Sequence, residues 1–394
     1  MMPPIKKRRR SSLATVTAVL MAIGLLAATA GCIGDPASET IIIPENEQSG
    51  GSVPIGGAFQ VSKIYPLPVL DPSGSSILGW ASGESVVGYF AENGSSAVPA
   101  TVGLQLLAPP YEKPLPLANQ ANGGTSLSSL SPDGKSIAEW TTTGDSGVSL
   151  TLIPLDGSPA KPIAIPQITK RTMLSRHLQW SSNSRYIAYM VSGESRAQML
   201  VVVCDARYGT VQQLPLHGYP TDGNASVMLS DDGNAVLLDD GKRVAMAKRN
   251  GDGSFEVQYD HPSRSGGGSI WVDANRFVFL GSDGTLFQYD TRNGELSVLL
   301  EKVTGFSLSP DRQAIAYTHG DQEAIFAGKL QGNNVLYQTT IYQGVVPNRM
   351  AWSLSGDALL VDGSRQPSRA AQNVDPAPAA QPGERLQTFI LTFQ

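Results

Sequence analysis

A short turn-and-strand unit recurs about seven times in this chain of 394 residues, and it limits the fold more than any other feature. In each copy an apolar residue or a tryptophan precedes a polar turn, which leads into an apolar strand. The copies begin at Leu70, Leu130, Trp180, Leu229, Trp271, Leu308 and Trp352. These starts lie 37 to 60 residues apart. Periods of about 40 to 50 residues are typical of propeller blades.

The turns have the chemistry of short hairpins. In the copy that starts at Leu130, Pro132 presets φ, Asp133 can accept hydrogen bonds from nearby amides, and Gly134 tolerates a left-handed geometry. Further apolar strands follow within each unit, with no helical period between them. We therefore expect residues 57–394 to form a single all-β propeller of seven four-stranded blades; the spacing also permits six or eight.

Five of the turns carry an aspartate, which raises the question of a metal site. These residues are Asp71, Asp133, Asp232, Asp273 and Asp311. Each belongs to the turn of its own blade, so we interpret them as structural turn residues. We expect them around the periphery of one face, and we expect the recurring tryptophans to pack in the core.

The sequence Ser-Pro-Asp-Gly-x-x-Ile-Ala at residues 131–138 resembles the TolB-like propeller repeat, a relative of the WD-type repeat. The resemblance covers residues 57–394 at the level of the repeat and implies a propeller fold. It implies no activity, because one fold supports many functions. TolB carries a separate N-terminal domain, and residues 33–56 are too short to form one, so its role is not transferred.

The two ends of the repeat region predict how the ring closes. Residues 386–393 form a candidate third strand of the last blade, and residues 59–62 can supply its outer strand. Closure by N- and C-terminal strands in one blade removes an exposed edge. Residues 363–384 form a low-complexity insertion, which is either floppy or a flap over the top opening.

The N-terminus has the order of an export signal. Five basic residues at 6–10 precede an uncharged, mostly apolar stretch at 13–30. Thr29-Ala30-Gly31-Cys32 then resembles the bacterial lipobox, with Thr29 where Leu is usual. The resemblance implies cleavage of a lipoprotein signal peptide (1–31) and lipid on Cys32. Residues 32–56 would form the lipidated Cys and a flexible tether.

This reading predicts a lipid-anchored protein on the extracytoplasmic face of the cell membrane, or on the outer membrane if the host has one. An uncleaved membrane anchor and an ordinary signal peptide cleaved nearby are the alternatives. Without the five leader cations, 24 basic and 34 acidic residues leave a net charge of −10. A body with this charge disfavours nucleic acid as a partner.

Motifs for catalysis are not found. The sequence has no His-Glu-x-x-His, no Cys-x-x-Cys and no Gly-x-Ser-x-Gly. We therefore predict no catalytic residue, no metal and no cofactor. Cys204 follows an apolar run and is interpreted as a buried, inert thiol.

Propeller ligands usually meet the central channel near the start of each first strand, and basic residues gather before two of these strands. The candidate ligand-binding residues are Lys170, Arg171, Arg176, His177, Asn348 and Arg349. Such a local basic patch on an acidic body is suited to an anionic group.

Three functions fit these features. The first is a non-catalytic scaffold that binds a protein partner or another ligand of the cell envelope. The second is a propeller enzyme, a hydrolase or lyase acting on a lactone or glycan in the central channel. The third is a ligand sensor that is coupled to a membrane partner.

Overall fold

The computed structural model divides the chain into two compact units, Met1–Pro54 and Ile55–Gln394. It describes residues 58–67, 76–81, 84–91, 102–117, 127–143, 147–165, 178–192, 198–220, 225–320, 322–364 and 386–394. All of these residues belong to the second unit, and they form strands and turns without a helix. A helix long and apolar enough to cross a membrane is accordingly not found among them.

Five sheets have four strands each. The first two contain β2 (Ser76–Trp80), β3 (Val86–Ala91), β4 (Val102–Leu107) and β5 (Leu115–Pro116), then β6 (Leu127–Leu130), β7 (Ser136–Thr143), β8 (Gly147–Pro154) and β9 (Lys161–Ile163). The next two contain β18 (Ser269–Trp271), β19 (Arg276–Leu280), β20 (Leu286–Asp290) and β21 (Glu295–Leu300), then β22 (Val303–Leu308), β23 (Ala314–His319), β24 (Ala324–Gln331) and β25 (Asn334–Gln343). The fifth contains β26 (Val346–Trp352), β27 (Ala358–Ser364), β28 (Leu386–Phe393) and β1 (Val61–Pro66).

The sixth sheet has eight strands, in two antiparallel halves. One half contains β10 (Gln179–Trp180), β11 (Tyr186–Ser192), β12 (Met199–Asp205) and β13 (Thr210–His217). The other contains β14 (Ser226–Leu229), β15 (Ala235–Asp239), β16 (Arg243–Arg249) and β17 (Phe255–Pro262). The outer strands β13 and β17 join the halves through a short parallel pairing, Leu216 with Phe255 and His217 with Glu256.

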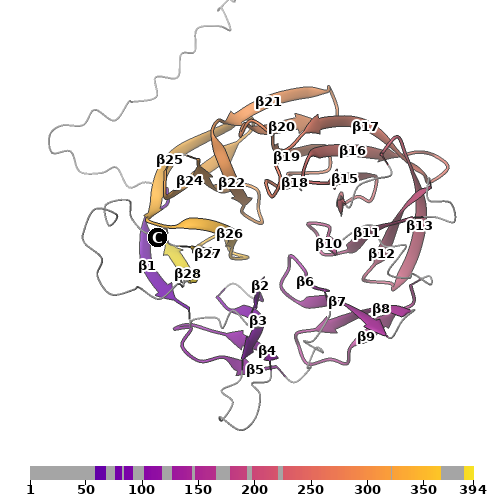
Figure 1. The fold of residues 1–394 in the computed structure, drawn as a ribbon. Helices are drawn as coiled ribbons and strands as arrows, with labels where there is room; N and C mark the ends of the chain where they lie inside the picture. Colours follow the sequence, from indigo (N-terminus) through magenta and orange to yellow (C-terminus); the bar gives the residue numbers. More distant parts are fainter. Residues whose placement is uncertain are drawn as a thin grey trace, which may run out of the picture. The chain divides into compact units, whose positions relative to one another are not determined.

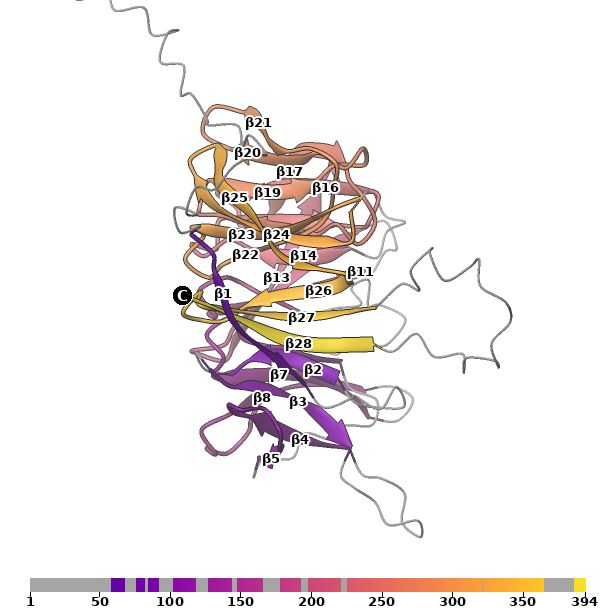
Figure 2. The same cartoon turned by 90° about the vertical axis from the view of Figure 1, so that its left-hand side faces the viewer.

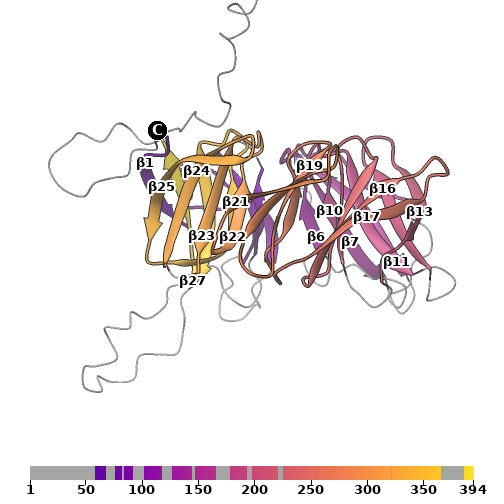
Figure 3. The same ribbon diagram turned by 90° about the horizontal axis from the view of Figure 1, so that it is seen from above.

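The sheets stand radially around a common centre, which confirms a propeller-like all-β fold (Figure 1). The first strand of each repeat lies innermost, and the strands cross the thickness of the ring (Figure 3). Because neighbouring strands within each repeat are antiparallel, the first-to-second and third-to-fourth turns share one face. We call this the turn face.

The N- and C-terminal strands close the ring, as the sequence predicted. β1 pairs antiparallel with β28 (Figure 2), and the backbone N–H of Gln394 donates to the carbonyl of Gln60 at 3.0 Å. The outer strand begins at Val61 and not at residue 59. Phe59 instead packs its ring against those of Trp352 and Phe393, with centroids 5.8 Å away in each case.

The structure corrects the position of the first repeat. β2 ends at Trp80 in the way that β6 ends at Leu130 and β10 at Trp180, so the first copy starts at Trp80 and not at Leu70. The turn-like residues 70–74 lie outside the described residues. Their composition matches that of the repeat turns, but composition alone does not fix the place of a segment within a blade.

A buried serine organises most of the turns between first and second strands. The Ser230 hydroxyl donates to Asp232 at 2.6 Å and accepts from the Ala235 amide at 2.9 Å. Ser131 and Ser309 make the same two bonds with their own turns. The structural interpretation of Asp133, Asp232 and Asp311 is therefore confirmed, whereas Asp71 lies outside the described residues.

The predicted peripheral location of these turns is wrong. Each turn follows the first strand of its repeat, and these strands lie innermost in the ring (Figure 1). Neighbouring turns also touch: the Asp133 amide donates to Ser184 Oγ at 2.9 Å, and the Asn183 amide donates to Asp231 Oδ1 at 2.7 Å. In the described part of the chain, however, no three His, Cys, Asp or Glu side chains gather to hold a metal ion.

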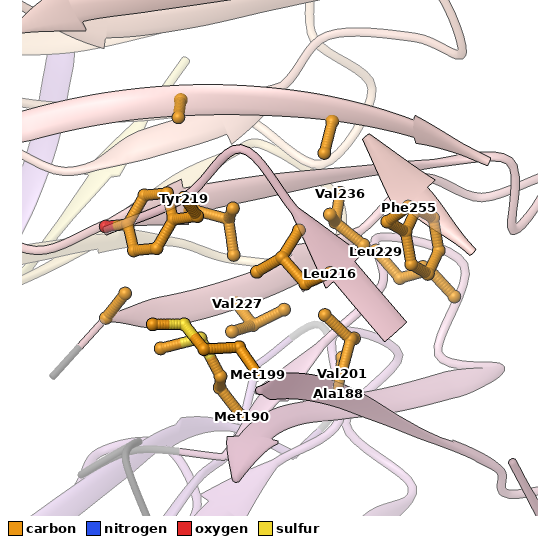
Figure 4. Close-up of a cluster of buried hydrophobic side chains, with 14 of the residues drawn as sticks. Ala188, Met190, Met199, Val201, Leu216, Tyr219, Val227, Leu229, Val236 and Phe255 are labelled. Atoms are coloured by element: carbon orange, nitrogen blue, oxygen red, sulfur yellow. The ribbon is translucent and has the colours of Figure 1, made fainter. Parts of the chain in front are cut away.

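Apolar side chains fill the space between adjacent sheets. In the cluster between the two halves of the eight-stranded sheet, Met190, Leu216 and Phe255 pack together with small and branched residues (Figure 4). The recurring tryptophans are buried as expected, and each ring N–H reaches the sheet before its own. Trp180 donates to the Ser129 carbonyl and Trp271 to the Met228 carbonyl, both at 3.1 Å. These bonds link neighbouring sheets.

Candidate functional site

The structure tests the predicted ligand-binding residues only in part. Lys170, Arg171, Arg176 and His177 lie outside the described residues, as does most of the predicted insertion, residues 365–384. Gly363 and Ser364, the first two residues of that insertion, belong to β27. Of the remaining two candidates, Asn348 is exposed on β26 and Arg349 follows it.

Arg349 bridges the seam where the ring closes. Its guanidinium donates to the carbonyl of Ile77 at 2.6 Å and also to that of Leu78, both on the innermost strand of the next sheet. The surrounding protein desolvates the cation and lowers the pKa of Arg349, which the carboxylate of Asp362 partly offsets. Arg349 thus has a structural role in linking the two sheets; ligand binding by this residue stays a prediction.

A second arginine links two turns on the turn face that belong to different sheets. Arg312 lies in the β22–β23 turn with φ of 61°, and its guanidinium donates to Ser182 Oγ in the β10–β11 turn at 2.7 Å. Burial lowers the pKa of Arg312, and the nearby carboxylates of Asp231 and Asp311 act in the opposite direction. Because arginine stays charged at neutral pH, this contact is a charge-assisted cross-link between turns of different sheets.

A cavity of about 260 Å³ opens between the two halves of the eight-stranded sheet. Its walls come from the β10–β11, β12–β13 and β14–β15 turns and from the adjacent residues of β11, β12, β13, β14 and β16. The polar residues that carry its chemistry are Arg185, Tyr186, Asp205, Tyr208, Gln212, Asp232 and Arg249. We call this cavity the Arg–Tyr groove.

Asp205 holds one wall of the groove. One carboxylate oxygen accepts from the backbone amides of Arg207 and Tyr208 at 3.0 and 3.1 Å, and the other accepts from Arg185 Nε at 2.9 Å. Asp205 is nearly buried, with 10% of its side chain exposed against 44% for Arg185. The hydrogen bond from Arg185 to Asp205 raises the pKa of Arg185. The carboxylate therefore fixes both the turn and the guanidinium.

Cation–π contacts arrange the tyrosines of the groove. The Arg185 guanidinium carbon lies 4.7 Å from the ring centroid of Tyr186 and 5.9 Å from that of Tyr208. Arg207 approaches the Tyr208 ring at 5.4 Å. Tyr208 is nevertheless 64% exposed, so much of its side chain is accessible from solvent.

The opposite wall carries Arg249 and Asp232. Arg249 Nη2 donates to the side-chain oxygen of Gln212 at 3.1 Å, a neutral partner. Burial acts to raise the pKa of Asp232, but hydrogen bonds from Ser230 and Asn234 outweigh it and lower the pKa overall. The groove thus offers guanidinium donors and tyrosine side chains, which are suited to binding an anionic or polar group.

Sequence reasoning did not find this groove. A signal was present: the dipeptide Arg-Tyr occurs at 185–186 and again at 207–208. The β11–β12 hairpin pairs Tyr186 with Asp205 and so brings the two dipeptides together. Arg249 comes from the other half of the sheet, and no local pattern connects it with the hairpin.

Other candidate groups do not converge. The three described histidines lie on β13, β17 and β23. Cys204 is a free thiol, and its predicted burial is confirmed; burial raises the pKa of this thiol to about 12.

Comparison with known proteins supports the fold. No protein-family model and no curated protein matches the chain significantly. An oligogalacturonate lyase in complex with manganese is similar, with a TM-score of 0.52 and 10% identity, over 84% of this chain and 91% of the lyase. A chain of the mitotic checkpoint complex has a TM-score of 0.52 and 13% identity, over 89% of this chain and 100% of that chain. U3-55K has a TM-score of 0.52 and 12% identity, over 84% of this chain and 98% of U3-55K.

Sequence identities this low support a similarity of fold and nothing further. The unit Ile55–Gln394 is a β-propeller. It is similar both to a lyase and to a subunit of a multiprotein complex, so the fold does not distinguish catalysis from binding, and that question has to be argued from the residues of this chain.

Proposed function

We propose that this chain is a lipid-anchored, extracytoplasmic propeller that binds a protein partner of the cell envelope without catalysing a reaction. The Arg–Tyr groove carries the binding role, because it presents arginine and tyrosine side chains on a rigid sheet. These residue types are enriched at the energetic centres of protein interfaces. The leader ending in Thr29-Ala30-Gly31-Cys32 supports the anchor and the location.

We further infer seven blades of the TolB-like type. Only two residue pairs join β13 to β17, whereas each half of that sheet is a complete antiparallel set of four strands. Each half therefore counts as one blade beside the five four-stranded sheets. The Ser-x-Asp turn chemistry and the repeat at 131–138 support the TolB-like assignment.

Metabolic labelling tests the anchor. The full chain is expressed in a bacterium fed with an azide-bearing fatty acid, and the azide is then coupled to a dye. We expect dye on the wild type and on Cys204→Ala, but none on Cys32→Ser. Dye that persists on Cys32→Ser would refute lipidation at Cys32.

Crosslinking tests the binding role. The lipidated chain is crosslinked in intact membranes, captured, and analysed by mass spectrometry. We expect a specific envelope protein that is absent from a control strain expressing an unrelated lipoprotein. Recovery of the same proteins from both strains would count against a binding function.

A further inference from the structure

The cations of the Arg–Tyr groove keep donors that the fold does not use. The Arg185 guanidinium uses only Nε for its bond to Asp205, and its other contacts in the described part of the chain are with the two tyrosine rings. A guanidinium has five N–H donors, so the edge formed by its two terminal nitrogens is open to a ligand. Such an edge can hold a carboxylate in bidentate fashion.

Two further arginines have no acidic partner among the described residues: Arg249 lines the groove, and Arg207 lies beside it in the β12–β13 turn. Arg249 bonds to the neutral Gln212, and Arg207 lies against the Tyr208 ring. The acids of the groove are occupied: Asp205 accepts from Arg185 and two backbone amides, and Asp232 accepts from its own turn. The groove therefore has unused guanidinium donors, which a negatively charged acceptor from a ligand would satisfy.

The size of the groove limits what can enter it. Small-molecule sites usually measure about 300–1,000 Å³. At about 260 Å³, the groove falls below that range and suits a single side chain with its flanking backbone. A sugar ring would stack on an aromatic face, and guanidinium groups compete for the ring faces of Tyr186 and Tyr208. These facts favour a peptide over a glycan.

The groove is also held in shape. The β13–β17 pairing ties its two walls together, and the apolar cluster beneath it contains Val203 and Leu229. A rigid site loses little entropy on binding, which favours recognition of a short segment.

We propose that the Arg–Tyr groove binds an acidic side chain on an extended segment of the protein partner. This inference rests on the binding function proposed above and specifies the chemistry of the partner. The acidic carboxylate meets Arg185 and Arg249, the cation of Arg207 beside the groove adds to their attraction, and the exposed ring of Tyr208 packs against the neighbouring backbone.

Fluorescence anisotropy tests the proposal with defined probes. The full chain, purified in detergent, is titrated into a fluorescein-labelled peptide of alternating Glu and Gly, and into the matching Gln–Gly peptide. At low salt we expect the Glu peptide to bind at least tenfold more tightly. Equal affinity for the two peptides would overturn the proposal.

Exposed arginines provide the variants and a matched control. Arg207→Gln and Arg249→Gln should each weaken binding of the Glu peptide at least threefold. Arg292→Gln is the control, because Arg292 occupies the equivalent turn between β20 and β21 but pairs there with Asp290. It should change the affinity less than twofold. An equal loss in Arg292→Gln would mean non-specific attraction and overturn the proposal.

Reversing the charge of two arginines tests whether the groove selects its peptide by charge. The double variant R207E/R249E, checked for folding by circular dichroism, should lose the Glu peptide and gain affinity for a Lys–Gly peptide. Retention of the Glu peptide would overturn the proposal. A trimer of galacturonic acid is the competing probe; displacement of the Glu peptide by this sugar at an equal or lower concentration would overturn the assignment to a peptide.

Membrane crosslinking separates this inference from the function on which it rests. If R207E/R249E captures the same partner as the wild type, the groove assignment fails and the binding function stands. If the wild type captures no partner, the proposed function itself fails. Loss of the partner in R207E/R249E alone supports both.

Discussion

Replacement of Ser230 by alanine isolates the contribution of one repeat turn to stability. The hydroxyl is fully buried, and it makes a charge-assisted bond to Asp232 at 2.6 Å. It also accepts the amide of Ala235, a residue that is itself 5% exposed. Removal of the hydroxyl deletes the first bond and leaves that buried amide without its acceptor.

The expected loss follows from these two bonds. A hydrogen bond to a charged group contributes about 1.5–3 kcal/mol, and an unsatisfied buried amide costs about 1–3 kcal/mol. Because the turn can relax, we expect Ser230→Ala to lower the free energy of unfolding by about 2–4 kcal/mol. With an unfolding entropy of about 2.1 cal/mol/K per residue over the unit Ile55–Gln394, this corresponds to a fall in Tm of about 3–6 °C.

Calorimetry measures this fall, with Ser62→Ala as the matched control. Ser62 also makes two hydrogen bonds, at 3.1 and 2.9 Å, but it is exposed, so its loss should cost less than about 1 kcal/mol. An effect of Ser230→Ala no larger than that of Ser62→Ala would refute the reasoning.

The pH dependence provides an independent check. Although burial opposes it, hydrogen bonding leaves the pKa of Asp232 below its usual value. A carboxylate of this kind stabilises the fold above its unfolded pKa of about 4, and this stabilisation is lost as pH falls toward the folded pKa. The difference between wild type and Ser230→Ala should therefore narrow below about pH 4. A difference that is the same at pH 3 and pH 7 would contradict this account.

Three further predictions concern single residues. Arg312 has a left-handed backbone, which costs a non-glycine residue about 1–2 kcal/mol. Arg312→Gly should therefore be more stable than Arg312→Ala by about that amount in urea titration. The reverse order would show that backbone strain does not determine the relative stability of the two variants. Arg349→Gln should lose about 1 kcal/mol in the same assay, because it removes donors to two carbonyls at the closing seam although the residue itself is exposed. Asn348→Ala, at a neighbouring exposed position, should lose almost nothing. With a pKa raised to about 12, Cys204 should resist a disulfide reagent at pH 8 in the native Cys32→Ser chain and react at once in guanidinium; rapid native reaction would contradict its burial.

The repeat made the fold predictable because its chemistry is local. A serine, an acid or amide and a left-handed position fall within four residues, so the turn is visible in the sequence at 131–134 and 230–233. Closure by residues 386–393 was also readable, because a strand pattern at the end of an incomplete blade requires a partner. The first repeat was misplaced because Leu70 begins a segment with the same composition as the true turns.

The groove was not predictable from local patterns. Its arginines come from two halves of a sheet, and the pairing of Leu216 with Phe255 that joins the halves spans only two residues on each strand. Arg312 shows the same limitation. It appears in the sequence as an ordinary turn residue after Asp311, although its partner Ser182 lies 130 positions earlier.

The bond between Gln394 and Gln60 has a consequence for the order of the chain. Because the two ends of the propeller meet within one sheet, a short linker can join them, and new ends can be opened in a surface turn such as residues 332–333. The circularly permuted chain would preserve every sheet while moving the seam to another sector of the ring. The ring therefore does not depend on which of its strands comes first along the chain.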